Sequence, residues 1–103
     1  MAIISGEHGA HQHITGGVWS DGVMWFGEGF KSRKIKEGTY VIEFERPFAK
    51  LPAVVCTVNG YEWKTFDKSV AIIEIWEGGF ICTTSDPKMP VDCTFTFITF
   101  GDV

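Results

Sequence analysis

The stretch from Tyr61 to Lys68, YEWKTFDK, carries residue types that can bind a sugar. Aromatic rings stack on the apolar face of a pyranose, and a carboxylate such as that of Asp67 accepts hydrogen bonds from its hydroxyl groups. The first interpretation is therefore a shallow carbohydrate site that includes Tyr61, Trp63 and Asp67. The second is that two of the three aromatic side chains, with Phe66 as the third, cap the end of a folded core.

The segment HGAHQH brings together His8, His11 and His13. In an extended strand, residues two positions apart project from the same face, so His11 and His13 could hold zinc or another transition metal. A complete site needs a further ligand, and a Gly-rich segment near a chain end is more often loosely packed. We assign no metal and no other cofactor to the chain.

Motifs of common enzyme classes are absent from the sequence. It has no Gly-x-Ser-x-Gly elbow, no phosphate-binding Gly loop, no HExxH and no Cys-x-x-Cys. Two carboxylates could meet in space as glycosidases require, but a small β-domain seldom provides the deep cleft for that chemistry. Glu74 lies in an apolar run, and we expect it to pair with a Lys or Arg there or at an interface, because a lone buried carboxylate is costly. The sequence predicts a protein that is not an enzyme.

The length of 103 residues matches one domain, and 45% hydrophobic residues are enough to form its core. Within that domain, we expect residues 1–37 to form weak strands that pack on the rest or on a neighbouring subunit, and residues 38–103 to form the main body. Trp19 and Trp25, around a Ser-Asp-Gly turn, are expected to pack in the same way. A small core cannot hold all of the apolar residues, so the chain is expected to form an oligomer.

The charge balance argues against a nucleic-acid partner. Nine Lys and Arg residues against thirteen Asp and Glu give a formal charge of −4, with no basic stripe to bind phosphates. No apolar run reaches the roughly 18 residues of a membrane span, and the first residues do not resemble a secretory signal. The localisation stays open, and we expect a cytoplasmic or virion-associated protein, or one released by a non-classical route.

The three cysteines, Cys56, Cys82 and Cys93, are odd in number and lie in apolar runs. This placement favours buried free thiols over a disulfide framework. The alternative is that Cys82 and Cys93 lie across a hairpin from each other.

Short runs with a period of two indicate an all-β fold, because no window shows sustained helical spacing. In one run Tyr40, Ile42 and Phe44 face one way and Glu43 and Glu45 the other. Strand-sized runs spaced by about ten residues predict an antiparallel β-sandwich of six to seven strands. We expect these runs at residues 39–45, 53–59, 70–76, 80–85 and 93–100, with weaker ones at 23–26 and 29–35.

Two connections in this sandwich can be predicted. Gly78 and Gly79 can take positive φ and so suit a hairpin between residues 70–76 and 80–85. Pro47 and Pro52 cannot donate to a sheet ladder, so the segment between them is expected to be a corner where the chain crosses from one sheet to the other.

Several side chains have expected places in this arrangement. Phe48 and Leu51 would act as apolar plugs at the end of the sandwich. The outer faces of two strands are expected to contact other subunits through Val70, Ile72, Trp76, Ile98 and Phe100.

The runs GTYVIEFERPFAKLPAVVCTV, VAIIEIWEGGFICTT and CTFTFITFG resemble the H-type lectin domain. In that family a strand ending in Ile-x-Phe leads through an aromatic-bearing corner to a Val-rich strand, and a Gly-Phe turn precedes the last hairpin. The resemblance covers about residues 38–101. The upstream GGVWSDGVMWFGEGF resembles the leader of bacterial and phage tail-fibre-like domains.

The resemblance implies a sandwich that assembles as a homotrimer or homohexamer and binds galactose or N-acetylgalactosamine at subunit boundaries. The family places an Arg near the start of the strand before the Gly-Phe turn, where this chain has Lys68 or Ser69. It places further sugar contacts in the loop after that turn, where this chain has Asp86 and Lys88. The expected function is a multivalent carbohydrate-binding module, and the alternative is a structural or receptor-binding domain of a phage tail fibre or similar trimeric appendage.

Overall fold

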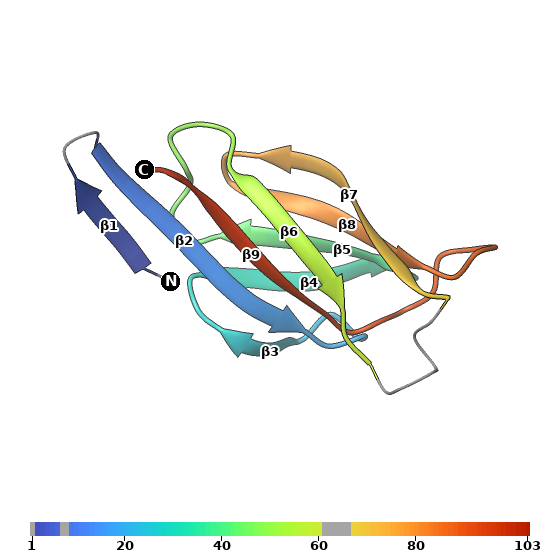
Figure 1. Ribbon diagram of the computed structural model, residues 1–103. Coiled ribbons are helices and arrows are strands. Elements are labelled where there is room, and N and C mark those ends of the chain that lie inside the picture. Colours follow the sequence, from blue (N-terminus) through green and yellow to red (C-terminus); the bar gives the residue numbers. More distant parts are fainter. Residues whose placement is uncertain (1, 7–8, 61–66) are drawn as a thin grey trace.

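The computed structural model describes residues 2–6, 9–60 and 67–103, which form two antiparallel β-sheets facing each other (Figure 1). The prediction of an all-β fold with two antiparallel sheets is confirmed. The described residues form nine strands instead of the expected six to seven. They contain no helix, and therefore none that could cross a membrane.

Sheet A has the strand order β1-β2-β9-β6, and β3 pairs with β2 beside this path. Its strands are β1 (Ala2–Gly6), β2 (Gly9–Val18), β3 (Met24–Gly27), β6 (Ala53–Val58) and β9 (Phe95–Asp102). Sheet B has the order β4-β5-β8-β7. Its strands are β4 (Phe30–Lys36), β5 (Thr39–Phe44), β7 (Ser69–Trp76) and β8 (Gly79–Ser85).

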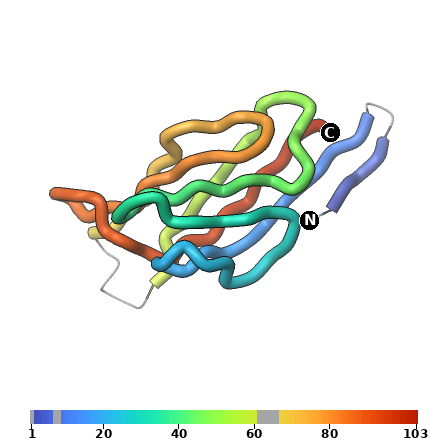
Figure 2. Tube along the Cα trace, turned by 180° about the vertical axis from the view of Figure 1, so that it is seen from behind, coloured from blue at the N-terminus to red at the C-terminus, as the bar shows by residue number. Residues whose placement is uncertain are grey.

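The N-terminal third of the chain contributes to both sheets. β2 pairs with β9 along its length, from His11 opposite Asp102 to Val18 opposite Phe95. The two ends of the sequence therefore lie side by side in sheet A, as the trace in Figure 2 shows. The sequence pattern missed β2, because its Gly and Thr residues weaken the period-two signal on the outward face.

The core fills the space between the sheets with aromatic and aliphatic side chains. Tyr40, Ile42 and Phe44 face inward from β5, as their spacing predicted. Phe80 of sheet B and Phe97 of sheet A meet edge to face, with ring centroids 5.2 Å apart. Burial of such large side chains is the main favourable contribution to the stability of a small domain.

The corner between Pro47 and Pro52 connects β5 in sheet B to β6 in sheet A, as predicted. Phe48 is 3% exposed and packs against Phe44, so it closes the end of the core. The prediction for Leu51 was wrong, since its side chain is 63% exposed. Phe48 and Pro52 are the buried residues of this corner, and the backbone N–H groups of Phe48 and Ala49 donate to the carbonyls of Glu77 and Asp102.

A β-bulge in β7 corrects the predicted orientation of that strand. Val70 and Ile72 pair with the buried residues Thr84 and Cys82, so they face inward rather than toward another subunit. The register then shifts between Ile72 and Glu74, which reverses the alternation. Glu74 is therefore exposed, whereas a regular strand would have turned its carboxylate toward the core.

The hairpin between β7 and β8 forms as predicted, but not for the predicted reason. Neither Gly78 nor Gly79 has a φ in the left-handed region. A Cβ on Gly79 would lie 2.1 Å from the carbonyl oxygen of Ile42 on β5. Glycine is needed there because two backbones approach closely.

Candidate functional site

A cavity of about 510 Å³ lies at one end of the sandwich, where three connections between strands meet. This volume is within the range of roughly 300–1,000 Å³ that is usual for ligand sites. The connections are the β2–β3 turn, the β8–β9 loop, and the described ends of the segment between β6 and β7, which are Asn59 and Gly60 on one side and Lys68 on the other. The described lining residues are Trp19, Ser20, Trp25, Val58, Asn59, Gly60, Lys68, Asp92, Cys93 and Thr94.

The aromatic wall of this cavity is formed by Trp19 and Trp25. Their rings stack with centroids 4.6 Å apart at an interplanar angle of 29°. They remain 44% and 38% exposed, which is unusual for the largest apolar side chain. Each exposed indole offers a large apolar ring and one N–H donor, and such a ring can stack on the apolar face of a ligand.

The β2–β3 turn holds these rings in place. The backbone N–H of Trp19 donates to the carbonyl of Val23, and the N–H of Gly22 donates to the carbonyl of Trp19. The side chain of Asp21 accepts a hydrogen bond from the Val23 N–H at 3.0 Å. Gly22 has φ of 93°, and a Cβ there would lie 2.4 Å from the backbone nitrogen of Lys34, so only glycine fits.

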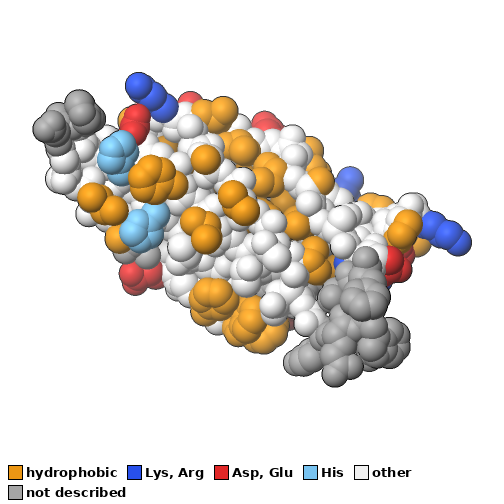
Figure 3. All heavy atoms as spheres, viewed as in Figure 1, with side chains coloured by type: hydrophobic (Ala, Val, Ile, Leu, Met, Phe, Trp, Pro, Cys, Tyr) orange, Lys and Arg blue, Asp and Glu red, His pale blue; other side chains and the backbone are white. Residues whose placement is uncertain are grey.

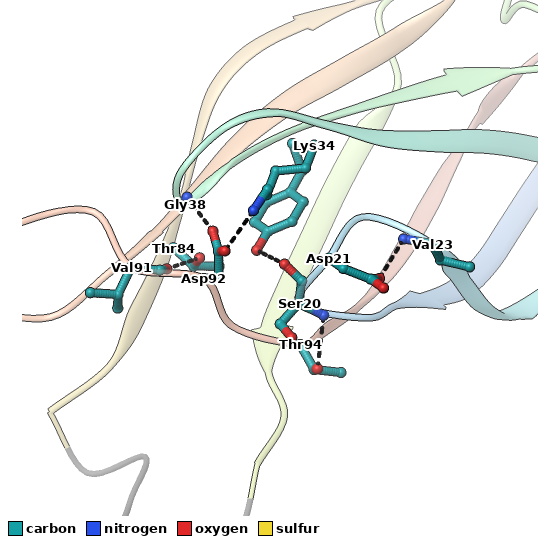
Figure 4. Close-up of polar contacts among 10 residues, drawn as sticks. Ser20, Asp21, Val23, Lys34, Gly38, Thr84, Val91, Asp92 and Thr94 are labelled. Carbon is teal, nitrogen blue, oxygen red and sulfur yellow. Dashed lines mark hydrogen bonds and ion pairs between the residues drawn. The ribbon is translucent and has the colours of Figure 1, made fainter.

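The floor of the cavity is tied to the core. The hydroxyl of Tyr40 donates to the carbonyl of Ser20 at 2.7 Å, and the Ser20 N–H donates to Oγ1 of Thr94 at 3.1 Å. Burial raises the pKa of Tyr40, and the negative charge of Asp92 raises it further, so the phenol stays a donor. The β2–β3 turn and the β8–β9 loop are therefore joined by a chain of hydrogen bonds (Figure 4).

Asp92 anchors the β8–β9 loop. Its Oδ2 lies 2.7 Å from Nζ of Lys34, and its Oδ1 accepts a hydrogen bond from the Gly38 N–H at 2.7 Å (Figure 4). Burial alone would raise the pKa of Asp92, but the hydrogen bonds from Lys34 and Gly38 and the positive charge of Lys34 outweigh it and hold the pKa below its ordinary value. Asp92 is therefore a structural carboxylate at neutral pH.

Lys68 is the one predicted site residue among those described that lines the cavity. Its Nζ lies 2.6 Å from Oδ1 of Asp67, and this hydrogen bond raises the pKa of Lys68. Asp67 itself is exposed in the turn before β7. The pair brings one positive and one negative group to the margin of the cavity.

The other predicted site residues lie elsewhere. Tyr61 and Trp63 are outside the described residues. Asp86 accepts hydrogen bonds from the N–H groups of Lys88 and Met89 at 2.8 and 2.9 Å, and these bonds lower its pKa. The Asp86 side chain thus shapes its own loop, and Lys88 is exposed on it, away from the described lining.

Sequence reasoning missed Trp19, Trp25, Asn59 and Thr94 as lining residues. The two tryptophans flank a Ser-Asp-Gly turn and were expected only to pack. The position of two Trp residues around a tight turn could have indicated a binding surface, because a turn lies on the surface and leaves large rings partly exposed. Asn59 and Thr94 gave no signal, since their position depends on the pairing of β6 with β9.

The histidines lie on a different part of the molecule. His11 and His13 project from the same face of β2, as predicted, while His8 is outside the described residues. Nδ1 of His11 lies 2.9 Å from Oδ1 of Asp102, without the alignment of a hydrogen bond. Within residues 2–6, 9–60 and 67–103, no three His, Cys, Asp or Glu side chains are placed to hold a metal ion.

All three cysteines are free. Cys82 is completely buried, and its neighbour Cys56 together with burial raises the pKa of the Cys82 thiol. Cys93 lines the cavity, where burial raises the pKa of its thiol. A thiol with a raised pKa is a poor nucleophile at neutral pH, so Cys93 contributes to the cavity as a small apolar group.

Searches against protein-family models, curated proteins and solved structures gave no significant match to this chain.

Proposed function

We propose that the protein is a carbohydrate-binding module whose site is the cavity at the end of the sandwich. The observation that supports this most is the exposed Trp19–Trp25 pair beside Asn59 and Lys68. An indole ring stacks on the apolar face of a pyranose, while an amide and an ammonium group bind its hydroxyls. The cavity volume accommodates one or two sugar rings.

The sugar class follows from the sequence resemblance rather than from the cavity. The H-type lectin resemblance points to galactose or N-acetylgalactosamine. A shallow site of this kind has millimolar affinity, equivalent to about 4 kcal/mol. Several copies presented together raise the apparent affinity by roughly a hundredfold to ten-thousandfold. We therefore propose that the protein acts as a homotrimer or homohexamer on a glycan-bearing surface.

We further propose that the site binds its ligand without chemical change. The carboxylate in the described lining is that of Asp92, and each of its oxygens already has a partner. A general acid or base needs an oxygen that is free to exchange a proton with the substrate. The engagement of Asp92 supports binding over catalysis.

A second candidate function is a structural or receptor-binding domain of a phage tail fibre or similar appendage. It is supported by the elongated shape, 46 × 24 × 20 Å, and by an apolar outer face of sheet A that suits assembly. In this case contact with sugars would be incidental.

A glycan array separates the two candidates. We expect the wild type to bind glycans ending in galactose or N-acetylgalactosamine, and Trp19→Ala to lose that binding while keeping its fold. Trp76→Ala is the matched control, because this indole lies on β7 over Gly79 and outside the described cavity lining. The absence of binding across the array would favour the structural function.

A further inference from the structure

The middle of the outer surface of sheet A has no charged side chains, unlike the outer surface of sheet B. We define the sheet A face by outward residues in the middle of β2 and β9 and along the neighbouring edge strand β6. These are His13, Thr15, Ala53, Val55, Thr57, Thr96, Ile98 and Phe100. None of these eight is Lys, Arg, Asp or Glu. The outward positions at one end of the same strands are His11 and Asp102, which lie 2.9 Å apart, and in Figure 3 the charged side chains lie around the rim of this face.

The apolar members of this face are well exposed. Val55 is 63% exposed, Ile98 57% and Phe100 46%. Ile4 of β1 and Phe26 of β3 extend the same face beyond β2, near the two ends of that strand, at 52% and 46% exposure. Exposed apolar surface on this scale marks an interaction site when it is contiguous.

Sheet B provides an internal comparison. Its outward positions include Lys31 and Arg33 on β4, Glu43 on β5 and Glu74 on β7. Arg33 and Glu43 form an ion pair at 3.7 Å. Charged side chains of this kind keep a sheet surface in water. The same chain thus places charged side chains across one outer face and leaves the middle of the other without them.

We infer that the sheet A face docks a second copy of this chain. The occupant follows from area and charge. An aromatic side chain buries about 150–250 Å² and Val or Ile somewhat less, so the five half-exposed side chains, with the Thr, Ala and His residues between them, offer on the order of 600–800 Å². This is the area that each partner of a stable interface contributes.

The charge of the chain points the same way. With a formal charge of −4, two copies repel each other over most of their surfaces. The eight residues of the sheet A face carry no carboxylate, and Asp102, the outward carboxylate at the end of β9, lies close to His11 and Lys50. Two copies that meet through the middle of the face therefore approach with few like charges in contact. The eight residues that define the face line none of the described cavities. An apolar surface without a described cavity fits another apolar surface better than it fits a small polar ligand.

The docking leaves the cavity at the end of the sandwich open, since the defining residues of the face are not among its described lining. The face thereby supplies the partner that the proposed multivalent binding requires. That role in binding rests on the proposed function, whereas the interface itself does not.

Sedimentation equilibrium of the full chain tests the inference, with Ile98→Lys as the disruptive variant. The matched control is Ile73→Lys, because Ile73 has the same side chain at nearly the same exposure, 60%, but belongs to sheet B. We expect the wild type and Ile73→Lys to associate into multiples of 11.5 kDa. Ile98→Lys should raise the dissociation constant by roughly a hundredfold or more, as expected for an unpaired charge in an interface. Circular dichroism checks that both variants fold.

Three results would overturn the inference. They are a wild type that stays monomeric up to near-millimolar concentration, an Ile98→Lys variant that associates like the wild type, and equal dissociation of both variants. Titration with a free monosaccharide keeps the two proposals apart. The affinity of each site should be the same in Ile98→Lys as in the wild type, with only the binding to a dense glycan surface reduced. Normal association without any sugar binding would refute the proposed function and leave the interface standing.

Discussion

Replacement of Gly79 by Ala should destabilise the protein strongly, whereas the same change at the adjacent Gly78 should not. A Cβ at position 79 would lie 2.1 Å from the Ile42 carbonyl oxygen and 3.0 Å from the Trp76 ring. The oxygen belongs to the backbone of β5, so it can move only if the pairing of β5 with β8 opens there. At Gly78 the nearest atoms, at 3.1 and 3.3 Å, belong to the Trp76 side chain.

The magnitude follows from these contacts. Overpacking costs about 1–3 kcal/mol, and loss of a ladder hydrogen bond adds roughly 0.5–1.5 kcal/mol. We therefore expect Gly79→Ala to lower the free energy of unfolding by about 2–4 kcal/mol. At about 4–8 °C per kcal/mol, Tm should fall by roughly 10–30 °C. Gly78→Ala should stay within about 0.5 kcal/mol of the wild type.

Urea denaturation followed by circular dichroism measures both variants against the wild type. Equal stabilities of Gly79→Ala and Gly78→Ala would refute the close approach of β5 and β8 at this position. So would a larger loss for Gly78→Ala, because it would mean that the turn depends on backbone conformation at residue 78.

Three further predictions concern the core, the loop anchor and the thiols. Phe80→Ala should cost about 3–5 kcal/mol in chemical denaturation, because it leaves a cavity where both sheets meet. The pKa of Asp92 is lowered by folding, so its stabilising contribution is complete above the unfolded pKa of about 3.9 and is lost as the pH falls through the folded value. The wild type should therefore lose more stability than Asp92→Asn when the pH falls below the unfolded pKa. Thermal melts of both proteins at several pH values measure this, and equal losses of Tm would mean that the carboxylate is unpaired. Cys82 has no exposed surface, so mass spectrometry should find it alkylated only as fast as the chain unfolds, and fast labelling of native protein would contradict its burial.

The alternation of apolar residues was enough to predict much of the sandwich. Tyr40, Ile42 and Phe44 face the core as their spacing requires, and the two prolines of the corner mark the crossing between sheets. These features depend on local chemistry, which a sequence displays directly. β2 was missed because its outward residues include Gly and Thr, and its place in sheet A depends on pairing with β9 at the far end of the chain.

Non-local geometry also explains the errors in side-chain placement. One extra residue in β7 reverses which side chains point inward after Ile72. No residue type in this strand indicates such a bulge. The candidate site was predicted in two loops, at residues 61–68 and 86–88, but the described lining comes from three connections that only the folded sheets bring together. Of the predicted residues, Lys68 reaches that lining because it directly precedes β7.

The central claim is that the cavity beside Trp19 and Trp25 binds a sugar. A titration of ¹⁵N-labelled protein with N-acetylgalactosamine and galactose, followed by NMR, tests it most directly. We predict saturable shifts, at millimolar ligand, of the indole N–H signals of Trp19 and Trp25 and of the backbone N–H signals of Asn59 and Thr94, while the signal of the Trp76 indole stays unchanged. Unchanged spectra up to the solubility limit of both sugars, or shifts confined to residues away from the cavity, would contradict the claim.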